Sequence, residues 1–348
     1  MDIINTLLNI VLPPIGLTLL LFFLPPYLFL KFLLSIIKPL FCENVAGKVI
    51  LITGASSGIG EHLAYEYAVR GACLALVARR EHRLQHVANR AMSIGSPDVL
   101  IIPADISKVE DCKRFVDVTV NHFGRLDHLV NNAGIAPICM FEETPDVTKL
   151  APAMDVNFWG SVYSSYFAIP HLKQSQGRII GIASAAGWLR TPRLSMYSAS
   201  KTAVISFYET LRVETGDEVG ITIVTPGIVE SEMTRGKFLN KEGRLVLDQE
   251  LRDAEMSLMP VLPVKEAAEA IVDGACEGVK YLTVPTWVRQ SIYWKVFSPE
   301  ILEWCNRILL MSRSGDETNT PSKKILDISG LKHLVYPDTI QSLQIREH

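Results

Sequence analysis

The segment that most constrains the fold is GKVILITGASSGIG, which runs from residue 47 to residue 60. Its apolar, β-branched start at 49–53 is typical of a buried parallel strand. A helical apolar pattern follows and ends at Gly71, where a C-terminal cap glycine is expected. Three glycines mark the turn between them: Gly54, Gly58 and Gly60. This order predicts a pyrophosphate site, because glycines admit the phosphates and the helix N-terminus offers free N–H groups.

Strand and helix patterns alternate along the rest of 45–285. Further strands are predicted in the segments 73–78, 100–107, 126–136, 177–184, 220–227 and 280–285. Helical patterns separate them at about 81–94, 107–123, 147–174, 196–215 and 264–279. Regular alternation predicts one α/β domain with a doubly wound parallel sheet of the Rossmann type. Ligands bind beyond the carboxyl ends of such strands, where we expect Asp105, Asn131, Ser184 and Pro226–Gly227.

The end of the second strand bears on the choice of coenzyme. An acidic residue there would bind the 2′-hydroxyl of an adenosine ribose and favour NAD(H). Ala78 holds that position, and Arg79 and Arg80 follow it. Because a guanidinium pairs well with a phosphate, Arg79 can hold a 2′-phosphate. The sequence therefore favours NADP(H) over NAD(H).

Tyr197 and Lys201 stand four residues apart in the predicted helix 196–215. This spacing places both on one helix face. We expect the lysine ammonium to favour phenolate and to lower the pKa of Tyr197, which suits a proton donor to a carbonyl oxygen. Ser184 ends the preceding strand, where its hydroxyl can orient the same oxygen. On most helices a Tyr/Lys pair is a plain surface pair, and only the upstream glycine turn favours catalysis here.

Together these motifs resemble the short-chain dehydrogenase/reductase family. The matching features are T-G-x-x-x-G-x-G at 53–60, N-N-A-G at 131–134, Asn157, Ser184 and Y-x-x-x-K at 197–201. The resemblance covers about residues 45–285 and implies a catalytic tetrad of Asn157, Ser184, Tyr197 and Lys201. In that family the tyrosine is the general acid and base, the lysine also binds the nicotinamide ribose, and the asparagine holds a water of the proton relay.

The resemblance also implies a set of coenzyme contacts. Asp105 matches the adenine side, and P-G-x-x-x-S at 226–231 resembles the loop on the nicotinamide side, with Ser231 where threonine is usual. The expected coenzyme-binding residues are Gly54, Ser56, Ser57, Gly58, Ile59, Gly60, Arg79, Asp105, Ile106, Asn132, Ala133, Gly134, Tyr197, Lys201, Pro226, Gly227, Val229 and Ser231. Relatives commonly form homodimers through the helices that carry the asparagine and the tyrosine. No metal is expected, since the cysteines and histidines lack ligand spacing.

Residues 1–41 form a separate apolar segment in which 3–30 carry no charge. A run of this length can span a bilayer as a kinked signal anchor. The pairs Pro13–Pro14 and Pro25–Pro26 tend to break a helix and would divide the run into pieces of about ten residues, each matching one leaflet. We therefore favour a hairpin that enters a membrane or monolayer and returns. Lys31 and Lys38 would keep the following domain cytosolic.

A proline-pair anchor before this domain is similar to the steroleosins, plant lipid-droplet proteins described as 11β-hydroxysteroid dehydrogenase-like. That resemblance implies an NADP(H)-dependent enzyme of steroid or lipid metabolism that interconverts a secondary alcohol and a ketone on a lipophilic substrate. It also implies a lipid droplet or endoplasmic reticulum location. Two alternatives remain: a reductase of another lipid carbonyl (a retinoid, a long-chain base or a fatty acyl ketone), or a coat protein with little turnover. The net charge of −3 and the lack of long basic runs argue against nucleic acid.

Two segments lie outside the shared motifs. Residues 232–263 mix charges with apolar side chains and are interpreted either as a lid over a bulky ligand or as an ordinary connection; the apolar members include Met233, Phe238, Leu239, Met256, Leu258 and Met259. Residues 286–348 are a C-terminal extension. Its aromatic first part, 286–311, predicts an interfacial helix, a dimer contact or a lid element. The final 36 residues are polar, and we expect a partly disordered tail there.

Overall fold

The computed structural model describes residues 2–37, 42–312 and 318–341. The chain divides into two compact units, Met1–Glu43 and Asn44–His348. Each unit is described by itself.

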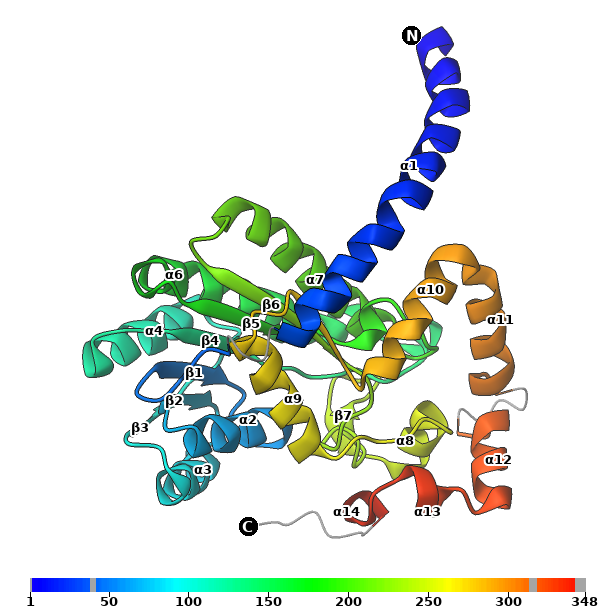
Figure 1. Cartoon of the computed structure of the whole chain (residues 1–348). Helices are drawn as coiled ribbons and strands as arrows, with labels where there is room; N and C mark the ends of the chain where they lie inside the picture. The colour runs from blue at the N-terminus through cyan, green and yellow to red at the C-terminus, as the bar shows by residue number, and fades with distance from the viewer. Residues whose placement is uncertain (1, 38–41, 313–317, 342–348) are drawn as a thin grey trace. The chain divides into compact units, whose positions relative to one another are not determined.

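The first unit is one apolar helix, α1 (Asp2–Ile37), which contains both proline pairs in its interior. Figure 1 shows it as a single curved ribbon. The expected division into three pieces with a return is therefore wrong for this structure. Each proline removes its own N–H and crowds the preceding turn, which bends the helix, but the turns on either side continue the helix through the bend. Side-chain hydroxyls add local bonds, as where Thr18 Oγ1 donates to the Pro14 carbonyl at 2.7 Å.

The helix α1 is long and apolar enough to cross a membrane. Its span Asp2–Leu34 has a mean hydropathy of 2.3, and none of its most apolar window is buried against protein. Those 33 residues extend for about 50 Å at 1.5 Å per residue, more than the roughly 30 Å of a hydrocarbon core. A helix that is apolar on all sides is stable only where its side chains are removed from water, in a protein core or in a membrane.

The second unit contains the predicted doubly wound sheet. Seven parallel strands lie in the order β3-β2-β1-β4-β5-β6-β9. Their bounds are β1 (Val49–Thr53), β2 (Cys73–Ala78), β3 (Val99–Pro103), β4 (His128–Asn131), β5 (Arg178–Ile182), β6 (Gly220–Pro226) and β9 (Tyr281–Val284). Every strand lies inside or within two residues of its predicted segment. The order reverses between β1 and β4, so the connections leave these strands in opposite directions and open a crevice at their carboxyl ends.

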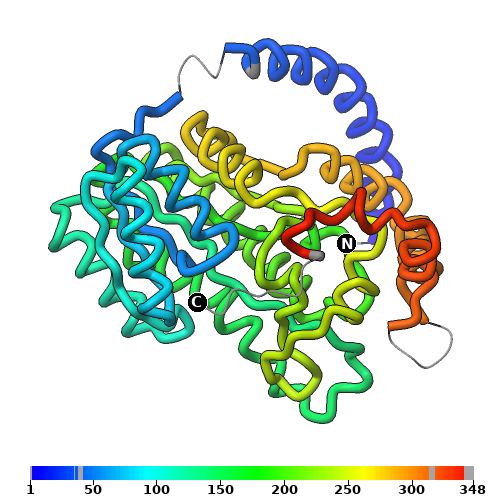
Figure 2. The backbone as a smooth tube through the Cα atoms, turned by 90° about the horizontal axis from the view of Figure 1, so that it is seen from below, coloured from blue at the N-terminus to red at the C-terminus, as the bar shows by residue number. Residues whose placement is uncertain are grey.

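Helices cover both faces of the sheet, as Figures 1 and 2 show. The helices α2 (Gly58–Val69), α3 (Glu81–Ile94) and α9 (Val264–Cys276) bury one face. The helices α4 (Val109–Phe123), α6 (Gly160–Ser175) and α7 (Ser195–Thr215) bury the other. The strands are apolar on both sides because each side meets a helix layer.

A smaller region stands at the carboxyl edge of the sheet. It contains the hairpin of β7 (Lys237–Leu239) and β8 (Leu245–Leu247), followed by α8 (Gln249–Met256). The C-terminal extension adds α10 (Gln290–Phe297), α11 (Pro299–Leu310), α12 (Pro321–Ser329), α13 (Lys332–Val335) and α14 (Asp338–Gln341).

The expectation of a disordered tail is wrong for residues 318–341. Leu326, Tyr336 and Ile340 are buried with Met256 and Val261 in one cluster, and Tyr336 Oη donates to the Ser257 carbonyl at 3.0 Å. A few apolar residues at helical spacing are enough to dock these short helices, although the polar run around them dilutes the signal. The rest of the expected tail, 313–317 and 342–348, lies outside the described residues.

Candidate active site

The glycine turn between β1 and α2 packs against the end of β4. Gly54 has φ +67°, and a Cβ atom there would lie 2.7 Å from Cα of Ala133. A Cβ atom on Gly60 would lie 2.4 Å from both Asn132 Nδ2 and the Gly54 carbonyl. Only glycine fits these two positions, and the N-terminus of α2 faces the same turn. The cradle therefore has the shape that a coenzyme pyrophosphate requires.

Thr53 holds the two strand ends together, a role that the sequence interpretation did not include. Its hydroxyl donates to the Val130 carbonyl at 3.2 Å and accepts from the backbone N–H groups of Asn132 and Ala133 at 3.0 and 3.2 Å. The Asn132 amide returns a bond to the Thr53 carbonyl at 3.0 Å. The sequence feature that could have indicated this role is the threonine that begins the T-G-x-x-x-G-x-G motif. Its bonds fix the cradle before any ligand binds.

The expected adenine side of the cleft begins at the end of β3. Asp105 Oδ1 accepts from the Ser107 N–H at 3.1 Å and from the Ser107 hydroxyl at 2.8 Å, so the carboxylate is held in a turn. The Asp105 N–H donates to Asp111 at 2.8 Å; this bond, and then Arg114, lower the pKa of Asp111. Ile106 is buried against Gly160 at the start of α6.

Arg80, rather than Arg79, contacts the glycine turn. Its Nη2 donates to Ser57 Oγ at 2.8 Å and to Ser56 Oγ at 3.1 Å, whereas the Arg79 side chain is exposed. The other guanidinium nitrogen, Nη1, pairs with Glu232 at 2.8 and 3.2 Å. The sequence signal was the arginine pair itself, but which member turns inward depends on the loop geometry after β2.

Glu232 is a further residue that sequence reasoning missed. Besides its ion pair with Arg80, Glu232 forms an ion pair with Lys237 Nζ at 3.0 Å and another with Arg83 Nη2 at 3.5 Å. Partial burial alone would raise the pKa of Glu232, but the hydrogen bonds from Arg80 and Lys237 outweigh it and lower the pKa. Three cations and one carboxylate thus meet beside the glycine turn and leave a net positive charge there.

The expected nicotinamide-side loop follows β6. The Gly227 N–H donates to the Val284 carbonyl at 2.8 Å, and Val229 is buried where it pairs with Leu262. Ser231 then approaches the glycine turn, with its Cβ 3.3 Å from the position of a Cβ on Gly58. Residues 226–231 therefore return to the cradle from the opposite side of the crevice.

Tyr197 and Lys201 lie one turn apart on α7, as predicted. Lys201 Nζ lies 5.8 Å from the centroid of the Tyr197 ring and donates to the Ile182 carbonyl at 3.0 Å. Ser184 follows β5; its hydroxyl accepts from the Ala186 N–H at 3.1 Å and forms a hydrogen bond with Tyr197. The structure brings all three side chains to the carboxyl edge of the sheet.

The pKa of Tyr197 departs from the sequence expectation. The ring keeps partial solvent contact, yet protein surrounds most of it, and this burial raises the pKa in spite of the hydrogen bond with Ser184. Burial also lowers the pKa of Lys201 to about 8. The expected fall in the tyrosine pKa is therefore wrong for the protein alone, because desolvation disfavours both charged forms.

Asn157 lies in a π-helical turn, Asp155–Trp159, directly before α6. Its Oδ1 accepts from the Ile135 N–H at 2.8 Å, and its Nδ2 donates to the Ile135 carbonyl and to Ser200 Oγ, both at 2.9 Å. A Cβ on Gly134 would lie 3.3 Å from Asn157 Oδ1 and 3.5 Å from Lys201 Nζ. The N-N-A-G segment, Asn157 and Lys201 therefore meet at one point.

Residues 232–251 supply an apolar wall beside Tyr197. The cluster joins side chains of this segment to those around the tyrosine: Met233, Phe238, Val246, Leu251, Ala136, Ile138, Leu194 and Tyr197. This packing favours a lid over an ordinary connection. Met256 and Leu258, which the sequence grouped with the lid, pack against the C-terminal helices instead.

The loop between Ser184 and Tyr197 is tied to the C-terminal helices. Trp188 Nε1 donates to Ser291 Oγ at 2.9 Å, and Asn306 Nδ2 donates to the Arg190 carbonyl at 2.7 Å. Two further bonds join Arg193 Nη1 to the Leu310 carbonyl at 3.1 Å and Thr191 Oγ1 to Glu255 Oε1 at 2.8 Å. The extension is therefore part of the architecture that holds the site, which among the three interpretations of residues 286–311 agrees best with a lid element.

Comparison with known proteins agrees with this geometry. Residues 48–242 match the short chain dehydrogenase family. The chain belongs to this family of oxidoreductases, and the predicted fold and family resemblance are confirmed.

Plant relatives extend the similarity over almost the whole chain. A protein of Sesamum indicum named 11-beta-hydroxysteroid dehydrogenase A is 55% identical over 342 residues, which cover 98% of each chain. An Arabidopsis thaliana protein named 11-beta-hydroxysteroid dehydrogenase 1A is 50% identical over 347 residues, 99% of each chain. Among solved structures, an alcohol dehydrogenase of the archaeon Thermococcus sibiricus, complexed with 5-hydroxy-NADP, is similar with a TM-score of 0.56. It shares 26% identity and covers 68% of this chain and 94% of its own.

Proposed function

We propose that this chain is a membrane-anchored, NADP(H)-dependent oxidoreductase that interconverts a secondary alcohol and a ketone on a lipophilic substrate, most simply a sterol or steroid. One observation carries the proposal: Tyr197, Ser184, Lys201 and Asn157 converge beside a glycine cradle of pyrophosphate shape. The plant relatives named 11-beta-hydroxysteroid dehydrogenase support the substrate class.

The side chains divide the chemistry between them. A bound nicotinamide coenzyme supplies or accepts the hydride. Tyr197 donates a proton to the ketone oxygen during reduction and takes it back during oxidation, and Ser184 orients that oxygen. The raised pKa of Tyr197 keeps the phenol protonated at neutral pH, which suits proton donation in the direction of reduction. Lys201 and Asn157 line the route by which a proton returns to Tyr197 after it has donated its own.

The charge beside the glycine turn supports NADP(H). Arg80, Arg83 and Lys237 face a single carboxylate, Glu232, so the group retains positive charge for a 2′-phosphate. Arg79 stands next in sequence and is free to approach the same phosphate from solvent. Ala78 supplies no carboxylate for a ribose hydroxyl. The similar archaeal structure carries an NADP analogue.

Coenzyme preference is tested with Arg79→Ala and Arg80→Ala. Each should weaken NADPH binding by about tenfold, the scale of one charge-assisted contact, with little change for NADH. Glu232→Gln is the matched control, since it removes the competing carboxylate and should strengthen NADPH binding. Calorimetric titration with both coenzymes measures the effect. Equal losses for NADH and NADPH would contradict the NADP(H) proposal.

The apolar features support a lipid-soluble substrate and a membrane location. The apolar wall beside Tyr197 matches a bulky apolar ligand, and α1 offers an anchor at a lipid droplet or the endoplasmic reticulum with the domain in the cytosol. A homodimer through α6 and α7 is supported by exposed apolar side chains on these helices, among them Tyr166 and Val213, and by Trp159 in the turn before α6.

The activity is tested by Tyr197→Phe in the full chain. Turnover of steroid and other lipid ketones with NADPH should fall by about 10²–10⁴-fold, the range of general acid catalysis. Tyr208→Phe is the matched control because Tyr208 lies on the same helix and is bonded to Asn131, away from Ser184. A panel of steroids, retinoids, long-chain bases and acyl ketones identifies the substrate. A wild-type chain without turnover on the whole panel would favour the coat-protein alternative.

A further inference from the structure

The C-terminal extension carries an exposed aromatic surface that the site does not use. We call it the aromatic face, and it consists of Trp287, Tyr293, Trp294, Phe297, Ile301, Trp304 and Ile308. Among the described residues of the second unit, five of the nine exposed aromatic side chains lie within residues 287–304. Trp294, Trp304 and Phe297 are 54%, 64% and 77% exposed. Such a cluster on one helix pair marks a contact surface.

Contacts on the inner side of α10 and α11 show which way the aromatic face points. Ser291 and Asn306 bond to the loop between Ser184 and Tyr197, and Leu310 accepts from Arg193. Val288 and Leu310 are buried. Since these contacts hold one side of α10 and α11 to the domain, the opposite side must point outward.

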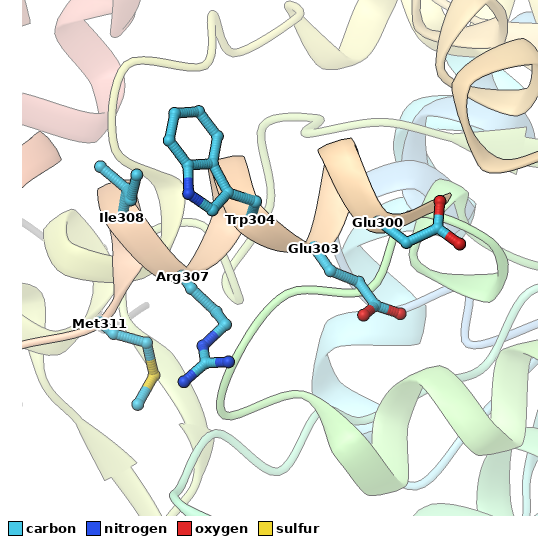
Figure 3. Close-up of a pocket in the computed structure, with 6 residues that line it drawn as sticks. All are labelled: Glu300, Glu303, Trp304, Arg307, Ile308 and Met311. Carbon is cyan, nitrogen blue, oxygen red and sulfur yellow. The ribbon is translucent and has the colours of Figure 1, made fainter. Parts of the chain in front are cut away.

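The side chains of α11 divide by chemistry. Figure 3 shows that Trp304 and Ile308 point away from Glu303 and Arg307, as the two edges of one exposed face of α11; these four residues line a pocket together with Glu300 and Met311. A helix with an apolar, tryptophan-bearing side and a charged side lies in the plane of a lipid–water boundary. Tryptophan and tyrosine prefer this boundary because each combines an apolar ring with a polar tip.

Cations adjoin the aromatic face. Arg190 is exposed and lies near Lys295 of α10, whose pKa is lowered first by the lysine's own partial burial and then by the charge of Arg190. Arg289 is exposed beside Trp287. Neighbouring cations at the edge of an apolar surface suit the anionic headgroups of a membrane.

The geometry points to a lipid surface as the partner of the aromatic face: α10 and α11 dock flat on the headgroup boundary of the membrane. The inference rests in part on the proposed membrane attachment through α1. Docking holds the loop of Trp188, Arg190 and Arg193 directly behind the docked helices, because that loop is bonded to their inner side. The loop that leads to Tyr197 is thereby held near the lipid surface.

Tryptophan fluorescence tests the docking in the full chain. Residues 1–41 contain no tryptophan, so α1 adds no signal, and three of the five tryptophans lie on the aromatic face. The chain is reconstituted in vesicles of phosphatidylcholine and phosphatidylserine whose phosphatidylcholine acyl chains are brominated, with unbrominated vesicles as reference. Bromine quenches only tryptophans that contact lipid, and we expect about half of the fluorescence to be lost.

Variants locate the contact. The pair Trp294→Phe and Trp304→Phe keeps the surface apolar but should leave about one third of the quenching, since one reporter remains. Trp159→Phe is the matched control, because Trp159 is 43% exposed and stacks on Tyr163 of α6, away from the aromatic face; it should keep the quenching in full. Phe297→Glu carries no reporter and should reduce quenching of the wild-type tryptophans at least twofold.

Three outcomes would overturn the docking. The first is a chain that floats with the vesicles but is not quenched, which leaves both the anchor and the turnover intact. The second is quenching that survives the double variant or disappears with Trp159→Phe. The third is a solvent exposure of Trp294 and Trp304 that falls as the protein concentration rises in detergent, which would assign the aromatic face to a second copy of the chain.

Discussion

The two sides of the proposed active-site cleft, a nucleotide side and a substrate side, are built in different ways. The nucleotide side consists of buried backbone and short side chains, in which Thr53, Gly54, Gly60 and Asn132 contact one another at fixed distances. The substrate side consists of a hairpin, short helices and a tied loop, joined through ion pairs and single hydrogen bonds. The first is set by close backbone packing between two strand ends that lie 78 to 80 residues apart in the chain. The second depends on single contacts between segments that lie from 64 to 117 residues apart.

This difference teaches where change is tolerated. A cradle without spare volume accepts no added atom, since nearby backbone cannot yield. A surface held by a few bonds can lose one of them and keep its fold. Substitutions on the nucleotide side should therefore have large effects on coenzyme binding, and those on the substrate side should have smaller effects on substrate alone.

The largest effect is expected for Gly60→Ala. The new Cβ would fall 2.4 Å from Asn132 Nδ2 and the Gly54 carbonyl, so the turn must open and coenzyme affinity should fall by about 100-fold or more. Coenzyme titration by fluorescence measures it. Ser57→Ala in the same turn removes only an acceptor of Arg80 and should cost less than tenfold. An unchanged coenzyme affinity in Gly60→Ala would contradict the view that the nucleotide side tolerates no added atom.

A smaller effect is expected for Asn306→Ala on the substrate side. The loss of the bond to the Arg190 carbonyl loosens the loop between Ser184 and Tyr197. We expect kcat/KM for the ketone to fall about fivefold, the cost of one hydrogen bond, while the coenzyme dissociation constant stays the same. Steady-state kinetics and coenzyme titration separate the two. Gln290→Ala, at an exposed position of α10, is the control and should change neither. A loss of coenzyme affinity would show that the two sides are not independent.

The smallest effect concerns Glu255 and pH. Burial raises the pKa of Glu255 to about 7, although Thr191 and Arg193 oppose the shift. The folded state then holds a proton that the unfolded state releases near pH 4.5, so this contribution to stability is complete below that pH and disappears as pH rises through 7. The thermal midpoint of the wild type, relative to Glu255→Gln, should fall by about 3–6 °C between pH 5 and pH 8.

Differential scanning fluorimetry at several pH values follows this difference. Glu250→Gln is the control, because Glu250 lies on the same helix with an exposed side chain. Parallel curves for wild type and Glu255→Gln would mean that Arg193 holds the carboxylate charged, and the substrate side would then be as rigid as the cradle.

Local patterns predicted the regular elements well. The seven strands and most helices follow from apolar runs and glycine positions, because such patterns act over a few residues. The segment 147–174 was predicted as helix, and the structure divides it into short turns, the π turn at Asp155–Trp159 and α6. That turn places Asn157 toward Ile135 and Ser200. A local pattern does not reveal this, since the register depends on the facing loop.

Three further points depended on distant contacts. Arg80 turns toward Ser57 because Glu232, 152 residues away, receives its other nitrogen. The tail helices fold because Leu326 and Tyr336 meet Met256 and Val261. The prolines of α1 were expected to end a helix, and the structure continues through them. In the first two cases a distant partner decided the outcome, and in α1 the neighbouring helical turns outweighed the tendency of proline to end a helix.

The sequence by itself determined the family, the parallel sheet and the position of the glycine turn, and it marked Asn157, Ser184, Tyr197 and Lys201 as the candidate catalytic residues, because motif spacing and chain periodicity are local properties. Only the tertiary structure decided the direction of the pKa shifts of Tyr197 and Lys201, the inward turn of Arg80 and the tie between the C-terminal helices and the loop between Ser184 and Tyr197. Desolvation and long-range hydrogen bonds arise only when distant segments pack together, and no short pattern encodes them.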